Sequence, residues 1–405
     1  MRVLVLCPHF APDTAPTGAV MTRIVRELTG RGHEVHVVTA LPWYREHTIE
    51  AGWSGRLVRT ERTAWGSISR VHPFPGDDRR DLVRRALGFI GFTLLVALTG
   101  LRAGGWFRRV DAVLAMSPPL TLGPTGWLLA RLRRGRCVFN IQDVFPDAAV
   151  RTGAITNRRV IAVASWLERT TYRLVDTVTV LSDDLAANVA GKLRRRSTPV
   201  VVIPNFVDTD TIVPGPRHNP YRAELGLGDA PVVMYAGNLG FSQSLDLVVE
   251  FARRHPEVEV VINGDGAARA HLEAATDDIE NLTMVGYQPA ERLSEVLAAA
   301  DVHLVPLRTG LGDVSVPSKS YSILAAARPV VAAIDPGTAV ARLLAESGAG
   351  IAVPPDDIVA LETAVMSLLD DPERRRGMGQ AGRAWVEANA SPTAVGEAYE
   401  RVLGG

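Results

Sequence analysis

The chain has 405 residues, which is enough for two domains of ordinary size. Hydrophobic residues make up 47% of the sequence and charged residues 22%, which excludes a disordered or collagen-like chain. The net charge is zero, but residues 1–205 contain 29 Lys and Arg against 16 Asp and Glu, and the remainder contains 15 against 28. A basic first half predicts an anionic partner, such as a membrane surface or an anionic acceptor. Because no nucleic-acid-binding motif accompanies it, we expect no nucleic acid partner.

The first forty residues have the pattern of a βαβ unit. An apolar run at 2–6 predicts a strand, 23–29 a helix and 34–39 a second strand. The connection before the helix is rich in proline and contains Gly18. Such a unit implies a parallel sheet that binds ligands at the carboxyl ends of its strands. Residues 40–78 are irregular and predict a small hairpin insertion, and further strands are expected at 111–115, 136–141, 177–181 and 200–203.

An apolar segment at 86–101 is flanked by arginines on both sides. It is shorter than the roughly 20 residues that span a bilayer. Two interpretations remain open: a helix that is buried or lines an acceptor cleft, or a helix that lies in the membrane interface. The apolar run that starts the chain predicts a strand rather than a leader, so we expect a cytoplasmic protein, with peripheral contact to the inner face of the membrane as one option.

Acidic residues follow the strand predicted at 136–141, in the stretch Q-D-V-F-P-D from Gln142 to Asp147. A carboxylate at the carboxyl end of a parallel strand lies where such sheets bind ligands, which favours a functional Asp143 over a turn or N-cap aspartate. Cys7 and Cys137 fall in apolar runs and predict buried thiols. No His/Cys cluster has the spacing of a metal site, so we expect neither a metal nor another cofactor.

The second half repeats the strand–glycine–helix pattern. A strand at 232–236 leads into G-N-L-G and a helix at 242–253, and a strand at 257–262 ends in N-G-D-G. Further strands are expected at 282–286, 301–306, 330–334 and 350–353. The proline-containing stretch 204–208 indicates a linker. We therefore predict an α/β protein with two Rossmann-like domains, at 1–205 and 206–388, and a final segment at 389–405.

A third feature of this half is the stretch S-V-P-S-K-S-Y at 315–321. Pro317 and Ser318 predict a helix start there, and Lys319 lies one position inside. A helix N-terminus that follows a glycine-containing loop is a prepared anion site. Lys319 is one of only two lysines in the chain. A phosphate-bearing ligand follows from this arrangement.

The pattern P-S-K-x-Y-x-x-x-A-A-x-R-P-V, with I-P-N-F-V-D near 205 and G-D-G near 265, resembles the family 4 glycosyltransferases. It is most similar to the bacterial branch that builds surface polysaccharides and lipid-linked sugars. The resemblance implies a GT-B fold, with the nucleotide-sugar donor in the second domain, the acceptor in the first and closure about residue 205. It also implies a metal-independent, retaining hexosyltransferase, a saccharide or polyprenyl-linked acceptor, and a last helix that crosses back to the first domain.

The resemblance further implies the site residues. Asp143, Lys319 and Arg308 are the expected catalytic residues, the two cations stabilising the departing diphosphate. The expected donor-binding residues are Gly18, Gly237, Asn238, Gly240, Gly264, Asp265, Ser318, Lys319, Tyr321 and Ser322. The chain departs from the family pattern where two glutamates would stand, at Val314 and Ser322, and where basic residues are common, at Asn238 and Gln243.

Two alternatives remain beside the active transferase. One is a nucleotide-sugar epimerase of the same fold, which needs no acceptor. The other is a catalytically degenerate scaffold that binds nucleotide sugar without turnover. The retained phosphate-handling residues favour the active enzyme.

Overall fold

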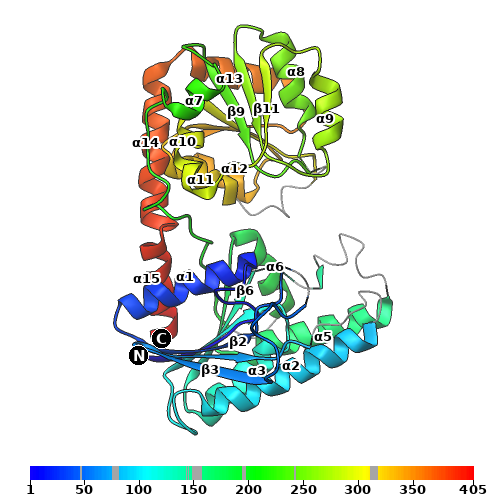
Figure 1. The fold of residues 1–405 in the computed structure, drawn as a ribbon, viewed down its shortest axis with the longest axis vertical. Helices are drawn as coiled ribbons and strands as arrows, with labels where there is room; N and C mark the ends of the chain where they lie inside the picture. Colours follow the sequence, from blue (N-terminus) through cyan, green and yellow to red (C-terminus); the bar gives the residue numbers. More distant parts are fainter. Residues whose placement is uncertain are drawn as a thin grey trace. The chain divides into compact units, whose positions relative to one another are not determined.

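The computed structural model describes residues 1–45, 48–74, 82–142, 144, 146–147, 157–193, 198–240, 243–310 and 318–405 (Figure 1). The chain forms two compact units. Unit 1 consists of Met1–Asn205 together with Val395–Gly405, and unit 2 of Phe206–Ala394. The expected Asp143 lies outside the described residues, as do residues 311–317.

Unit 1 is built on an eight-stranded sheet of order β3-β4-β2-β1-β5-β6-β7-β8. The strands are β1 Arg2–Leu6, β2 Glu34–Ala40, β3 Val58–Thr63, β4 Gly66–Val71, β5 Ala112–Ser117, β6 Arg136–Ile141, β7 Thr177–Val180 and β8 Val200–Val202. All neighbours pair in parallel except β3 with β4. The hairpin expected within 40–78 is therefore present, but β4 also extends the sheet by pairing in parallel with β2.

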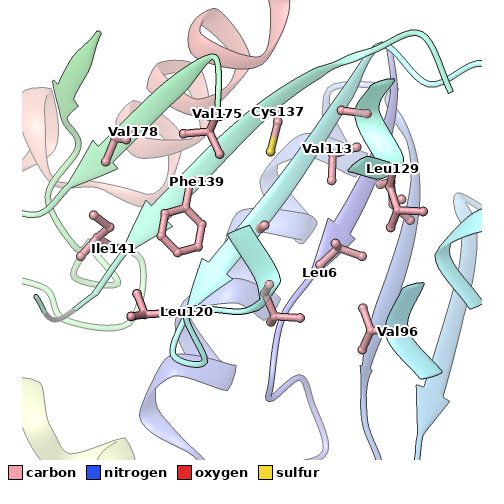
Figure 2. Close-up of a cluster of buried hydrophobic side chains, with 14 of the residues drawn as sticks. Leu6, Val96, Val113, Leu120, Leu129, Cys137, Phe139, Ile141, Val175 and Val178 are labelled. Carbon is pink, nitrogen blue, oxygen red and sulfur yellow. The ribbon is translucent and has the colours of Figure 1, made fainter. Parts of the chain in front are cut away.

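Helices cover the sheet of unit 1 and bury its apolar runs. They are α1 Pro16–Gly30, α2 Leu82–Arg102, α3 Leu122–Leu132, α5 Arg158–Leu174, α6 Asp183–Leu193 and the last helix, α15 Pro392–Gly404. Figure 2 shows how the core is assembled, with Leu6, Val113 and Phe139 of the strands facing Leu129 of α3 and Val96 of α2. These residues are almost completely buried. Both cysteines are buried free thiols.

The end of the chain packs into unit 1. Asn140 of β6 donates a hydrogen bond to the hydroxyl of Tyr399 at 2.7 Å, and both residues are buried. Arg31, just after α1, pairs with Glu397 at 3.1 Å. The buried hydrogen bond and the surface ion pair hold α15 on the sheet although it follows unit 2 in the sequence.

Unit 2 contains a six-stranded parallel sheet of order β11-β10-β9-β12-β13-β14. The strands are β9 Val232–Ala236, β10 Glu259–Asn263, β11 Leu282–Val285, β12 Val302–Pro306, β13 Val330–Ala333 and β14 Gly350–Val353. The order runs outward from β9 and then reverses, so the topological switch point lies between β9 and β12. Parallel sheets of this kind bind ligands beyond the carboxyl ends of the strands at that point.

The helices of unit 2 pack on both faces of its sheet (Figure 1). They are α7 Pro220–Glu224, α8 Asp246–Arg254, α9 Arg269–Thr276, the short 3-10 helix Ala290–Arg292, α10 Leu293–Ala298, α11 Ser318–Ala325, α12 Ala339–Ser347, α13 Ile358–Leu369 and α14 Pro372–Asn389. The α/β class and the two parallel sheets predicted from the sequence are confirmed.

Candidate functional site

Two glycine turns meet at the carboxyl ends of β9 and β10. Gly237 follows β9 with φ +148°, and Gly264 follows β10 with φ +155°. A Cβ on Gly264 would lie 1.8 Å from the carbonyl oxygen of Gly237, so only glycine allows the two turns to approach. The amide of Leu239 donates to the carbonyl of Asp265 at 2.8 Å and joins the turns further. Two predicted glycine motifs therefore form one surface at the switch point.

Lys319 lies directly over this surface. It is the second residue of α11, and a Cβ on Gly237 would come 2.5 Å from its Cε. Its Nζ donates to the hydroxyl of Tyr235 at 2.7 Å and lies 4.9 Å from the centre of that ring. Among the described residues no carboxylate lies within 4.0 Å of this ammonium group. Burial lowers the pKa of Lys319 from its usual value to about 8.

The ammonium group of Lys319 lacks a counter-charge, which a bound anion could supply. A buried ammonium group held by a neutral hydroxyl and an aromatic face keeps most of its desolvation cost. A bound phosphate would supply the missing counter-charge at the place where backbone can approach it closely.

Arg308 follows β12 and lies near Asp246, at the end of the segment that begins with Gly237. Its guanidinium is half exposed and lies 3.5 Å from Asp246, in the first turn of α8. The segment from Gly237 to Asp246 is therefore bracketed by Lys319 at its start and Arg308 at its end. Thr309, the residue after Arg308, donates a hydrogen bond to the carboxylate of Asp356. The pKa of Asp356 is lowered mainly by a hydrogen bond from Ser244 and also by the charge of Arg308.

The remaining expected donor-binding residues differ in their surroundings. Asn238 and Asp265 are exposed on the two turns, and the amide of Gly240 donates to Gln243 at 2.9 Å. Ser318 is the first residue of α11, and Ser322 lies partly buried one turn further on. Asn238 and Asp265 therefore place exposed polar side chains along the turn surface.

Tyr321 occupies a different environment, in the core of unit 2. It is 5% exposed and stacks on Trp385 of α14 with ring centres 6.0 Å apart. Burial raises its pKa to about 12. Its packing therefore fixes α11, and with it Lys319, against α14.

Unit 1 contains a histidine–aspartate pair that was not predicted from the sequence. His9 follows β1, next to the switch point between β1 and β5, and its Nδ1 lies 2.7 Å from the buried Asp13. Its ring stacks on Trp43, with centres 5.7 Å apart. The position directly after the first strand of a βαβ unit was the signal that could have identified it.

Gly18 belongs to the same neighbourhood but plays a packing role. It lies in the first turn of α1, and a Cβ there would come 3.0 Å from the Cβ of His9. The carbonyl of Gly18 accepts a hydrogen bond from Thr22 at 2.7 Å. Glycine at this position lets the helix start approach the loop that carries His9.

The stretch after β6 is partly described. Gln142 is buried and donates to Asn140 at 2.8 Å, so its amide is tied to the interior network that reaches Tyr399. Asp147 pairs with Lys192 at 2.8 Å. Lys192 also pairs at 2.7 Å with Glu168, which is 1% exposed, and so forms a largely buried ion pair.

Within the described residues no group of three or more His, Cys, Asp and Glu side chains could hold a metal ion.

Comparisons with known proteins complete the description. The sequence matches the glycosyl transferase 4-like domain over residues 17–205 and the glycosyl transferases group 1 family over residues 219–385. It is 27% identical over 383 residues to a putative colanic acid biosynthesis glycosyl transferase of Escherichia coli K12, covering 91% of this chain and 92% of that protein.

Two further likenesses span almost the whole chain. A D-inositol 3-phosphate glycosyltransferase of Kineococcus radiotolerans is 32% identical over 438 residues, covering 99% of this chain and 95% of that protein. Among solved structures, sucrose-phosphate synthase of Thermosynechococcus elongatus superposes with a TM-score of 0.71 at 18% identity, covering 99% of this chain and 98% of that chain. The last likeness shows a common fold.

Proposed function

The chain belongs to the family 4 glycosyltransferases of GT-B fold, and on that premise we propose that it transfers a hexosyl group from a nucleotide sugar to an acceptor hydroxyl with retention of configuration and without a metal. The donor is held by the glycine turns of unit 2 and the acceptor by unit 1. The product belongs to a surface polysaccharide or a glycolipid. The similarity to a colanic acid biosynthesis transferase supports this product class.

The observation that carries the proposal is Lys319 above the joined glycine turns. When the bond between the anomeric carbon and the diphosphate breaks, negative charge develops on the departing phosphate oxygen. A positioned ammonium group with little water around it stabilises that charge strongly. Arg308 supplies a second charge at the end of the same segment. In this proposal the two cations do the work that a metal does in other transferases.

Retention requires the acceptor to attack from the face that the diphosphate leaves. The acceptor hydroxyl then lies beside the departing phosphate, which takes its proton as the new bond to the anomeric carbon forms. His9, held by Asp13, is proposed to position the acceptor in unit 1. Its location after β1 supports this role, because ligands of parallel sheets bind at that edge.

An exposed apolar face of unit 1 supports a lipid-linked acceptor. Helix α2 buries Phe92 and Val96 but leaves Leu94 59% and Leu98 55% exposed, so its apolar character continues around the helix. Helix α3 contacts both α2 and α5, and the three lie along one side of the sheet (Figure 1). We define the apolar face by the exposed residues Phe89, Ile90, Leu94, Leu98, Trp106, Phe107, Leu128, Leu132, Val163 and Trp166.

Arginines surround this face. Exposed guanidinium groups lie at Arg102, Arg108, Arg109, Arg131, Arg134, Arg158, Arg159, Arg169 and Arg173. Among the described side chains of α2, α3 and α5, the one acidic residue is the buried Glu168. No helix among the described residues is long and apolar enough to cross a membrane. An apolar surface with a basic rim fits the headgroup layer of an anionic membrane, where each arginine contributes about 1 kcal/mol.

The transferase proposal is tested with UDP-, GDP-, dTDP- and ADP-linked sugars and purified protein, without added metal. We expect one donor class to raise the melting temperature, because a ligand that binds only the folded state stabilises it. Turnover is then followed with a lipid-linked acceptor, and the anomeric configuration of the product is determined by NMR. Conversion of the donor into its epimer without any acceptor would identify an epimerase. Binding without any turnover would identify a scaffold, and inversion would refute the retaining mechanism.

The membrane proposal is tested by co-sedimentation with vesicles. We expect binding to vesicles rich in phosphatidylglycerol and much weaker binding to phosphatidylcholine alone. The variant Val163→Ser/Trp166→Ser should reduce binding, whereas Val359→Ser, at a 62% exposed valine of unit 2, should not. Equal binding of all variants, or binding independent of lipid charge, would exclude this face as the docking surface.

A further inference from the structure

Unit 2 contains a groove that the transferase chemistry does not use. It has a volume of about 720 Å³ and runs along α14, between the segment Pro214–Arg217 and the turn that joins α11 to β13. Its volume is that of sites for drug-sized ligands and nucleotides.

The groove lies at the opposite edge of the sheet from the glycine turns. Asp301 and Pro329 line it, and they immediately precede β12 and β13. Gly237 and Gly264 instead follow β9 and β10. Since all these strands are parallel, the amino ends that border the groove are separated from the carboxyl ends by the length of the strands. A ligand in the groove does not occupy the turn surface below Lys319.

Positive charge dominates the groove. Five arginines line it, Arg217, Arg328, Arg375, Arg376 and Arg383, against two acidic residues, Asp301 and Glu387. Glu387 is paired with Arg383 at 2.6 Å. Asp301 is shared between Arg217 at 3.1 Å and Arg375 at 3.7 Å, and outside the groove wall it is also 3.7 Å from Arg222.

Two of these arginines therefore keep an unbalanced charge. Arg328 and Arg376 have no carboxylate within ion-pair distance among the described residues. Burial lowers the pKa of Arg328; the charge of Asp301 raises it, and the charges of Arg217 and Arg375 lower it further. Because Arg328 is a buried cation close to other cations, a bound anion would offset part of its desolvation cost.

The guanidinium groups are also held in place before any ligand arrives. Arg328 donates to the carbonyls of Gly215 at 2.9 Å and Ala298 at 2.6 Å. Carbonyl oxygens fix its orientation but bring no negative charge. The Nε atoms of Arg217 and Arg328 are buried without a hydrogen-bond acceptor in the described structure. Each is a donor that an anion could satisfy.

We propose that this groove binds a phosphate-bearing small molecule at a second anion site, separate from the donor site. Planar guanidinium groups match the geometry of phosphate oxygens and bind them in pairs. The volume admits a sugar phosphate or a nucleotide rather than a bare ion. The site is built from unit 2 alone and does not depend on the transfer reaction.

The test is calorimetric titration of the full chain with pyrophosphate in low-salt buffer, with sulfate at equal ionic strength as the reference. Arg376 is exposed and makes no hydrogen bond or ion pair among the described residues, so Arg376→Glu leaves the fold intact. Arg374→Glu is the matched control, because it reverses a charge on the same helix outside the groove. Lys319→Met removes the cation of the donor site.

We expect pyrophosphate to bind more tightly than sulfate, Arg376→Glu to weaken it about fivefold to tenfold, and Arg374→Glu to change it less than about twofold. Binding should persist in Lys319→Met. Equal weakening by the two arginine variants would show that surface charge alone attracts the anion. Loss of binding in Lys319→Met, or no binding up to millimolar pyrophosphate, would overturn the proposal.

Discussion

Replacing Lys319 with Met removes an ammonium group from the donor surface and keeps an unbranched side chain of similar length. The Nζ of Lys319 has one hydrogen-bonded partner among the described residues, the hydroxyl of Tyr235 at 2.7 Å. Burial lowers the pKa of Lys319 from 10.5 to about 8. With about 1.4 kcal/mol for each pKa unit, the charged form costs the folded, ligand-free protein about 3 kcal/mol.

The variant should therefore be more stable and less active than the wild type. Losing the hydrogen bond to Tyr235 costs about 1 kcal/mol, which leaves a gain of about 1–2 kcal/mol in the free energy of unfolding. Losing the contact with a desolvated phosphate costs at least about 2 kcal/mol, which is roughly 30-fold in nucleotide-sugar affinity. The two effects have opposite signs because the charge is costly until a ligand compensates it.

The pH dependence follows from the same shift. Between about pH 8 and pH 10.5 the unfolded chain keeps a proton on Lys319 that the folded, ligand-free protein has lost. The free energy of unfolding of the wild type should therefore rise with pH across this window relative to Lys319→Met. Nucleotide-sugar affinity should fall as pH rises above about 8, because the ammonium group is lost. Urea unfolding and calorimetric titration at several pH values measure both.

Lys192, the other lysine in the chain, provides the control. Its Nζ pairs at 2.7 Å with Glu168, whose side chain is 1% exposed. Lys192→Met should lower the free energy of unfolding by about 3 kcal/mol, because it leaves a buried carboxylate without its counter-charge. Nucleotide-sugar affinity should not change. If Lys319→Met instead destabilised the protein as Lys192→Met does and left the affinity unchanged, Lys319 would be a structural residue.

Two further predictions concern packing and the acceptor side. A Cβ on Gly379 would lie 2.1 Å from the carbonyl oxygen of Ala327, so Gly379→Ala should lower the free energy of unfolding by about 2 kcal/mol or more. Gly377, on the same helix, has no atom within 4 Å of such a Cβ, so Gly377→Ala should raise the free energy of unfolding by about 0.5–1 kcal/mol. Urea denaturation of the two variants measures both changes. His9→Phe keeps an aromatic ring but loses the hydrogen bond to Asp13. Turnover should fall at least about tenfold with donor affinity unchanged, and unaltered turnover would exclude His9 from acceptor positioning.

The apolar runs of the sequence determined the strands, because a parallel sheet covered on both faces requires continuous apolar segments. The predicted strands at 232–236 and 350–353 match β9 and β14. Glycines after two of these strands, and the helix start near Ser318, were also visible in the sequence. Local pattern suffices for these features because each depends on a few neighbouring residues.

Tertiary structure decided which side chains face one another. Tyr235 lies 84 positions before the lysine that it contacts, and Glu168 lies 24 positions before Lys192. In the sequence Lys192 is only the first residue of a basic run, K-L-R-R-R, whereas the structure places it in a largely buried ion pair. Tyr321 matched a donor-binding motif, but it packs on Trp385.

The sequence also did not predict which face of a helix would be exposed. Residues 86–101 of helix α2 include no charged residue, so their composition could not say which of them would meet the core. The strand order and the packing of α3 bury Val96 and leave Leu94 exposed. Periodicity identifies a buried face only where polar residues mark the other one, and contacts between distant segments form only when the whole sheet closes around its core.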